Sequence, residues 1–349
     1  MPKLRIAYSP QSLDLKHPVD RRRLIYWANK RGHEVVTDLE TKADVLVLSG
    51  RADLAVWTRK QNRPPVLLDL VDGYLGKEEY WRDWARGAGK VLTGQISGVP
   101  QPYRKIVSEA CSLAQAVICE TIEQKSTILP FCKNVHSILD FHEEFPMLDF
   151  NYGGASRNFP SLMWEGLPFT AKGLLQLRDS IKKIARVHPL AIEMVTDPTY
   201  PLVLGKYLYR GTEGILKDIP KILGENFKLT KWSLEAVVAT AKKSHLSVLP
   251  LDPNGALNPL KAENRLLMMW RVGLPVLTSP SLAYSRVMAA TDLDGICSTP
   301  SEWYEKILQM IESPELRANS VERGQQYIRD THAEALVLEA WDNVFESVL

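Results

Sequence analysis

The chain has 349 residues, which is more than one hydrophobic core usually supports, so two domains are expected. Its composition, with 45% hydrophobic and 24% charged residues, is typical of a soluble globular protein. The formal net charge of +2 gives no sign of a nucleic-acid-binding or acidic-tail protein.

Targeting and redox signals are weak. The N-terminal segment MPKLRIAYSP has too short an apolar run for a secretory signal, and no stretch approaches the roughly 20 apolar residues of a membrane span. The four cysteines form no CxxC pair, so neither a zinc site nor a disulfide scaffold is expected. They are interpreted as core residues of a cytoplasmic protein.

Short apolar runs alternate with helical patterns in the first part of the chain. A helix is predicted over 18–32, between Pro18 and Gly32. The predicted strands around it are 4–8, 33–37, 43–49, 65–70 and 116–120. This alternation indicates βαβ units and a parallel sheet.

The alternation stops over 141–160, where Pro, Gly, Asn and Ser gather, and a domain boundary is therefore predicted at residue 150. Strands are then predicted at 161–166, 190–196, 246–251 and 275–279, with helices at 170–187, 233–243 and 281–290 and three helical patterns over 300–348. The sequence thus predicts two α/β, Rossmann-like domains with parallel sheets, and a ligand site in the cleft that they face.

One stretch, NPLKAENRLLMMWRVGLPVLTS (258–279), crowds Lys261, Asn264 and Arg265 before an apolar helical run. A helix starting near Ala262 would place them in its first turn, where cations are normally disfavoured. An anion such as a diphosphate, bound by the free N–H groups and the two cations, would explain the pattern. The alternative is that Lys261 and Arg265 simply point into water.

This stretch, extended to Met288, resembles the donor-binding region of GT-B glycosyltransferases of the group-1, family four-like type. Further segments are similar to the same family in the expected order: 162–177, 231–251, 302–328, 332–348 and, more loosely, 43–75. The resemblance implies an acceptor-side domain at 1–150, a nucleotide-sugar donor domain at 151–330, and a helix at 331–349 that returns to the first domain.

The resemblance also implies a function: transfer of a sugar from a UDP- or GDP-linked donor to a saccharide, lipid or other acceptor, in polysaccharide biosynthesis. No metal and no other cofactor would be needed. The implied donor-binding residues are Lys172, Lys261, Asn264, Arg265, Glu165 and Asn258.

Candidate catalytic residues lie on the first domain. Asp69 and Asp72 end a predicted strand, and His17 lies in the loop after the first strand, so Asp72 or His17 could activate an acceptor hydroxyl. The alternatives are that Asp72-Gly73 is only a turn and that His17 is only solvated.

The chain departs from the family pattern at several positions. Two glutamates that many members carry correspond to Leu260 and Met268, and a frequent arginine corresponds to Gly166. The segment SPQSLDLKHP replaces the glycine-rich loop after the first strand. The alternative function is therefore a non-catalytic GT-B-like nucleotide binder or partner in a polysaccharide pathway; a nucleotide-sugar epimerase ranks third.

Two basic segments suggest a surface role. Arg21, Arg22 and Arg23 crowd one helix start, where they could face an anionic membrane or an anionic acceptor. Residues 78–90 combine Trp81 and Trp84 with basic side chains, which is compatible with peripheral membrane contact or with an ordinary surface helix.

Overall fold

The computed structural model describes residues 2–77, 79–150, 159–201 and 209–349. The chain divides into two compact units. Unit 1 comprises residues 1–143, 259–262 and 332–349, and unit 2 comprises residues 144–258 and 263–331. The boundary predicted at residue 150 falls next to residues 151–158, which lie outside the described residues.

Unit 1 contains a six-stranded sheet in which every pair of neighbours is parallel, in the order β2-β1-β3-β4-β5-β6. Its strands are β1 (Arg5–Ser9), β2 (Glu34–Val36), β3 (Val45–Ser49), β4 (Val66–Leu70), β5 (Ala116–Cys119) and β6 (Val135–Ser137). Its helices are α1 (Pro18–Arg22), α2 (Leu24–Arg31), α3 (Leu54–Trp57), α4 (Tyr80–Leu92), α5 (Tyr103–Leu113), α6 (Ile122–Ile128) and α14 (Glu334–Glu346).

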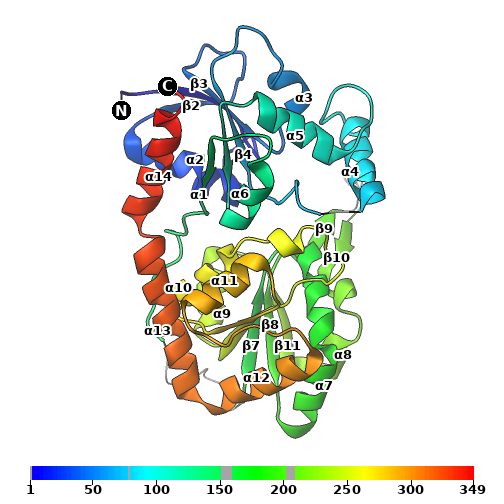
Figure 1. The fold of residues 1–349 in the computed structure, drawn as a ribbon. Helices are drawn as coiled ribbons and strands as arrows, with labels where there is room; N and C mark the ends of the chain where they lie inside the picture. The colour runs from blue at the N-terminus through cyan, green and yellow to red at the C-terminus, as the bar shows by residue number, and fades with distance from the viewer. Residues whose placement is uncertain (1, 78, 151–158, 202–208) are drawn as a thin grey trace. The chain divides into compact units, whose positions relative to one another are not determined.

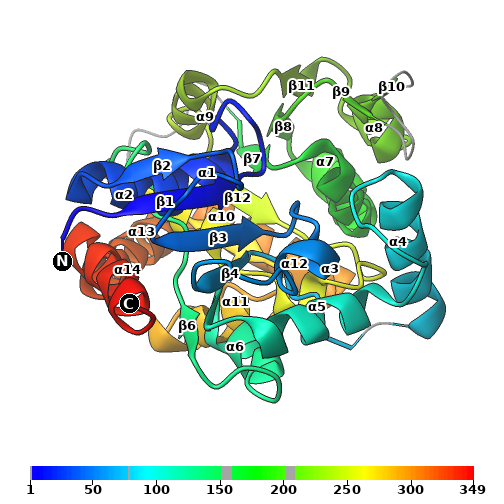
Figure 2. The same ribbon diagram turned by 90° about the horizontal axis from the view of Figure 1, so that it is seen from above.

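Both faces of this sheet are buried, which explains why its strands are continuous apolar runs. Leu46, Leu68 and Val117 pack on one face with residues of α5. Their sequence neighbours point to the other face and pack with residues of α2 and α14. Helix α14 (red in Figure 1) lies beside α2 in Figure 2, where the Trp27 and Phe345 rings stack at 4.3 Å.

Unit 2 contains a five-stranded parallel sheet in the order β11-β8-β7-β12-β13. Its strands are β7 (Ser161–Glu165), β8 (Ala191–Val195), β11 (Phe227–Thr230), β12 (Leu246–Leu249) and β13 (Val276–Thr278), and β9 (Thr199–Pro201) and β10 (Tyr209–Gly211) form a separate antiparallel pair. Its helices are η1 (Pro168–Leu177), α7 (Arg178–Val187), η2 (Thr212–Leu216), α8 (Ile219–Leu223), η3 (Gly224–Asn226), α9 (Leu234–Ala241), α10 (Asn264–Arg271), α11 (Leu282–Ala290), α12 (Pro300–Glu312) and α13 (Pro314–Thr331), while the turn η4 (Asn258–Leu260) has residues in both units.

The strand orders locate a topological switch point in each sheet. In unit 1 the chain runs from β1 outward to β2 and then returns to β3 on the other side of β1. In unit 2 it runs from β7 to β8 and β11 and then returns to β12 on the other side of β7. Ligands of open α/β sheets bind beyond the carboxyl ends of the strands at such points.

Two predicted helices differ from the structure. The helix expected over 18–32 is interrupted at Arg23, whose backbone (φ −120°, ψ −113°) separates α1 from α2. The first half of the helix expected over 170–187 is the 3₁₀ segment η1, and only α7 is α-helical. Both departures lie next to side chains that the candidate site uses.

Candidate functional site

Arg265 lies at the carboxyl edge of the unit 2 sheet. It occupies the first turn of α10, and its Nη1 donates to the Glu165 carbonyl at 3.0 Å, at the end of β7. A Cβ atom on Gly166 would stand 2.7 Å from the same Nη1. The guanidinium therefore occupies the space that any side chain at position 166 would need.

Lys172 is exposed on η1, which follows β7 at the switch point of unit 2. The next residue is fixed by a close approach, since a Cβ on Gly173 would lie 2.1 Å from the Pro250 carbonyl oxygen, just past β12. The Lys-Gly pair thus brings a cation beside the loop that follows β12.

The Glu165 side chain is buried and accepts a hydrogen bond from Trp232 Nε1 at 2.8 Å. Trp232 is tied to the end of β8, because its backbone N–H donates to the Thr196 carbonyl. Sequence reasoning missed Trp232 and Thr196. Thr196 ends the predicted strand 190–196, which was a usable signal, whereas Trp232 follows β11, a strand that the sequence did not predict. Glu165 thus links the ends of three strands.

Asn258 and Asn264 have separate positions. Asn258 Nδ2 donates to the Asp252 carbonyl at 2.5 Å, and this bond closes the loop after β12. Asn264 is the first residue of α10 and is half-buried. Asn258 therefore shapes the loop, and Asn264 lies beside Arg265.

Lys261 lies outside the predicted helix turn. It belongs to unit 1 and precedes α10 by three residues, and its Nζ is 3.9 Å from Asp72 Oδ1. The backbone before it is fixed, because Gln124 Nε2 donates to the Leu260 carbonyl at 3.1 Å. The prediction that Lys261 shares the first helical turn with Asn264 and Arg265 is wrong.

Asp72 is better placed than His17 or Asp69 to contact an acceptor hydroxyl. It follows β4, is about one-third exposed (33%), and accepts a hydrogen bond from the Tyr74 hydroxyl at 3.1 Å. His17 is the N-cap of α1, where its Nδ1 accepts the Val19 N–H at 3.3 Å. The capping bond occupies one ring nitrogen of His17, whereas Asp72 keeps an exposed oxygen beside Lys261.

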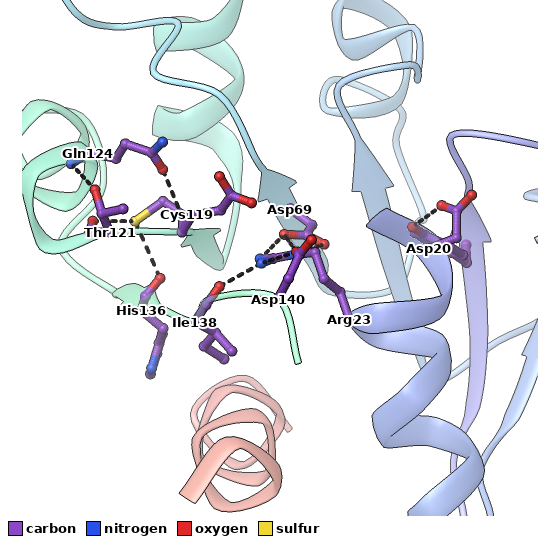
Figure 3. A network of polar contacts seen from close by, with 11 residues as sticks. Asp20, Arg23, Asp69, Cys119, Thr121, Gln124, His136, Ile138 and Asp140 are labelled. Atoms are coloured by element: carbon purple, nitrogen blue, oxygen red, sulfur yellow. Dashed lines mark hydrogen bonds and ion pairs between the residues drawn. The ribbon is translucent and has the colours of Figure 1, made fainter. Parts of the chain in front are cut away.

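Asp69 is committed to a buried ion pair (Figure 3). Arg23 Nε and Nη2 donate to its carboxylate, with the shortest distance 2.6 Å, and both side chains are fully buried. Arg23 Nη1 also donates to the Ile138 carbonyl at 2.6 Å and lies 3.5 Å from Asp140. The run of three arginines had suggested that Arg23 faces a membrane or an anionic acceptor. Its burial in this ion pair excludes both roles.

Glu120 adds a further carboxyl group at the end of β5. Its backbone N–H donates to Gln124 Oε1 at 2.8 Å, and its side chain is buried. Burial, and then the Asp140 carboxylate, raise the pKa of Glu120 well above its ordinary value, against the lowering effects of Arg23 and Lys261. Glu120 therefore retains its proton more readily than an exposed glutamate. Sequence reasoning missed it, although an acid directly after a buried strand is a usable signal.

The cysteines lie in the core. All four are buried, as predicted, and none forms a disulfide within the described residues. Among the described helices, none has the length and apolarity required to cross a membrane. Within the same part of the chain, no three His, Cys, Asp or Glu side chains are grouped so that they could hold a metal ion.

One hollow of unit 2 lies away from these residues. It has a volume of about 250 Å³ and is lined by Leu148, Ala241, Lys242 and Gly273, among others. Ala241 and Gly273 precede β12 and β13, so this hollow is at the amino edge of the sheet. Ligand sites of such sheets lie at the opposite, carboxyl edge.

No protein-family model and no curated protein matches the sequence, but solved structures match the fold. A glycosyltransferase from Rickettsia africae matches with a TM-score of 0.63 at 9% identity, over 100% of this chain and 99% of that one. WaaG, a glycosyltransferase involved in lipopolysaccharide biosynthesis, matches with a TM-score of 0.61 at 12% identity, over 97% of this chain and 98% of that one.

A third similar structure is S. aureus TarM, in complex with UDP, with a TM-score of 0.61 at 12% identity. The match covers 86% of this chain and 55% of TarM, so the chain spans about half of that protein's length. Together with two parallel α/β sheets, these similarities define the fold. The chain has the GT-B glycosyltransferase fold, as the sequence predicted.

Proposed function

We propose that the protein is a glycosyltransferase that takes a sugar from a UDP- or GDP-linked donor and moves it to a glycan, lipid or other acceptor. Unit 2 binds the donor and unit 1 provides the acceptor side. The observation that carries the proposal is Arg265, held by the Glu165 carbonyl in the first turn of α10 at the carboxyl edge of the unit 2 sheet.

The donor diphosphate would bind at the N-terminus of α10. Free backbone N–H groups there carry a partial positive charge, and Arg265 offers a planar fork that suits phosphate oxygens. Lys172 adds a second cation from the loop after β7. As the glycosidic bond breaks, charge grows on the leaving diphosphate, and these groups stabilise it without a metal ion.

The acceptor would lie against unit 1. Asp72 accepts a hydrogen bond from Tyr74 and has Lys261 near its other oxygen, so an acceptor hydroxyl could donate to the same carboxylate. Peripheral membrane contact through α4 stays a prediction; Trp81 and Trp84 on this helix are exposed.

Nucleotide binding is the first test. UDP, GDP and their sugars should raise the melting temperature of the wild type by ligand linkage. Arg265→Ala should abolish that shift, while Arg186→Ala, which removes an exposed arginine of unit 2 at the end of α7, should keep it. If no nucleotide stabilises the wild type, the proposal is wrong.

The second candidate is a non-catalytic nucleotide binder, and two positions favour it. Leu260 and Met268 are buried, and neither side chain carries the carboxylate oxygens that accept strong hydrogen bonds from sugar hydroxyls. A protein that binds UDP or GDP with dependence on Arg265, yet neither transfers the sugar to any acceptor in a panel nor hydrolyses the donor, would support this candidate over the enzyme.

A further inference from the structure

Three cationic side chains of unit 1 lie near its switch point, apart from the ion pairs described above. Arg51 follows β3, and its Nε donates to Gln11 Oε1, beyond β1, at 3.4 Å. Arg86 and Lys90 come from α4. Strands β1 and β3 flank the switch point, so these groups lie where an open α/β sheet binds its ligand.

Lys90 contacts an amide group and an aromatic ring. Its Nζ donates to Gln95 Oε1 at 3.1 Å and lies 4.5 Å from the centroid of the Tyr103 ring. Within the described residues it forms no ion pair with a carboxylate. Gln95 in turn donates to the Gly50 carbonyl at 2.9 Å, which ties Lys90 to the loop that carries Arg51.

The surroundings of Lys90 are electropositive. Partial burial, followed by the Arg51 and Arg86 charges, lowers the pKa of Lys90 to about 8, and Asp72 opposes that shift. The ammonium group of Lys90 is thus close enough to Arg51, Arg86 and Asp72 to be affected by their charges. Arg51 is exposed, whereas Arg86 and Lys90 are partly buried. A partly buried ammonium group beside two guanidinium groups is stabilised when an anion binds among them.

Two tyrosines and Asp72 complete this surface. The Tyr74 and Tyr103 rings meet edge to face, with centroids 5.2 Å apart, and Tyr74 donates to Asp72. The Tyr103 hydroxyl is buried, makes no hydrogen bond within the described residues, and is within electrostatic range of Arg86 and Asp72. It is a donor left available close to the cations.

We propose that Arg51, Arg86 and Lys90 bind an anionic group of the acceptor, a phosphate, sulfate or carboxylate, beside Asp72. This inference rests on the proposed transferase function and narrows its acceptor to an anionic molecule. The anion would complete the charge balance around Lys90, and an acceptor hydroxyl on the same molecule would then lie near the Asp72 carboxylate.

Sulfate is a suitable probe because it does not titrate near neutral pH. Isothermal titration calorimetry of the full chain at pH 7 and low salt should detect sulfate binding. Lys90→Gln and Arg51→Gln should each weaken it about tenfold or more, as expected for loss of a charge-assisted contact. Lys105→Gln, an exposed lysine on α5 of the same unit, should leave it unchanged.

The pH dependence of sulfate affinity distinguishes a direct contact with Lys90 from a general effect of the protein's positive charge. Between pH 7 and 9 the protonated fraction of a group with a pKa of about 8 falls to roughly one in ten, so wild-type affinity should fall about tenfold. Lys90→Arg keeps its charge over this range and should bind sulfate with little change. The charged and titratable groups that act on Lys90 are Arg51, Arg86 and Asp72, and the Tyr103 ring lies against its ammonium group.

The outcomes are distinct. Absence of sulfate binding, or equal binding by the wild type, Lys90→Gln and Arg51→Gln, would overturn the inference even if UDP binding is intact. Loss of sulfate binding in Lys172→Gln instead would assign the anion to unit 2 and also overturn it. Repeating the titration with glycerol 1-phosphate and with phosphatidylglycerol vesicles tells a soluble acceptor from a lipid one.

Discussion

The Arg265 guanidinium lies where a side chain at position 166 would lie: its Nη1 is 2.7 Å from the position of an ideal Cβ on Gly166. The resemblance to GT-B transferases suggested a missing cation at position 166. In this chain the guanidinium of Arg265 reaches that place from α10 and is held by the Glu165 carbonyl. The glycine therefore allows the arginine to lie there.

Gly166→Ala is expected to displace Arg265. The new methyl group would also lie 3.0 Å from Thr170 Oγ1 and 3.1 Å from Trp164 Cζ2, and the φ of +159° is one that side chains rarely adopt, so the melting temperature should fall as well. UDP or GDP affinity should fall about tenfold, or roughly 1.4 kcal/mol. The control is Gly214→Ala, where a Cβ meets nothing within 4 Å. Equal nucleotide affinity in both variants would contradict the assignment.

Breaking the buried ion pair between Arg23 and Asp69 should destabilise unit 1. Removing one partner of a buried pair leaves an uncompensated charge, so Arg23→Met should cost about 3–5 kcal/mol of unfolding free energy. The exposed Arg178–Asp218 pair has the same paired geometry, with side chains 46% and 38% exposed, and Arg178→Met should cost about 0–1 kcal/mol.

Urea unfolding monitored by circular dichroism measures both variants. The double variant Arg23→Met/Asp69→Leu should recover part of the loss, because Asp69 no longer stays buried without a cation. Similar losses for Arg23→Met and Arg178→Met would show that burial does not set the energy of these pairs.

Much of the fold was predictable because burial leaves its mark on local sequence. Strands covered on both faces are continuous apolar runs, and β1, β3, β4 and β7 were found in that way. The break at Arg23 was not predictable, because the Arg23 side chain pairs with Asp69, which is 46 residues away in sequence. No local pattern reports a partner at that distance.

The candidate site was predictable only in part, for the same reason. Arg265 and Lys172 lie beside strand ends, so their positions followed from the order of the elements. Lys261 differs because Leu260 and Gln124 fix the preceding backbone in unit 1. The grouping of Arg51 with Lys90 depends on Gln95 and Gly50, which the sequence alone does not bring together.

Glu120 should make stability depend on pH. Its folded pKa is raised, so the folded state binds the proton more tightly than the unfolded state, whose glutamate pKa is about 4.3. Stability from this group is thus lost as pH rises from about 4.3 toward the folded pKa, with a slope of up to about 1.4 kcal/mol per pH unit.

Glu120→Gln removes this titration. The variant should therefore gain stability relative to the wild type as pH rises from 5 to 8, which urea unfolding at several pH values can measure. Glu225→Gln, at an exposed position of unit 2, should track the wild type at every pH. A constant difference between Glu120→Gln and the wild type over this range would contradict the raised pKa.

Leu260 should be required for packing at the position where the resemblance to GT-B transferases had suggested a glutamate. A Cβ on Gly73 would lie 2.5 Å from the Leu260 Cβ, and one on Gly76 would lie 2.7 Å from its Cδ1. Gly76→Ala should therefore cost about 1–3 kcal/mol by overpacking. Leu260→Ala removes the Cδ1 atom that Gly76→Ala would meet, so this double variant should lose less stability than the sum of the two single variants. Gly73→Ala should gain less from Leu260→Ala, because alanine keeps the Cβ that the new methyl group would meet.

Leu260→Glu tests what the departure from the family pattern means. The leucine is only 8% exposed, so a carboxylate there would lose its water against the Gly73 turn, with Asp72 and Glu120 nearby. We expect a loss of at least about 2 kcal/mol in urea unfolding and no gain in UDP or GDP affinity. Leu260→Met, which conserves volume, is the control and should cost under about 1.5 kcal/mol. A stable Leu260→Glu variant with tighter nucleotide binding would instead mean that the position can still serve the donor, and that the leucine is a loss of function rather than a packing requirement.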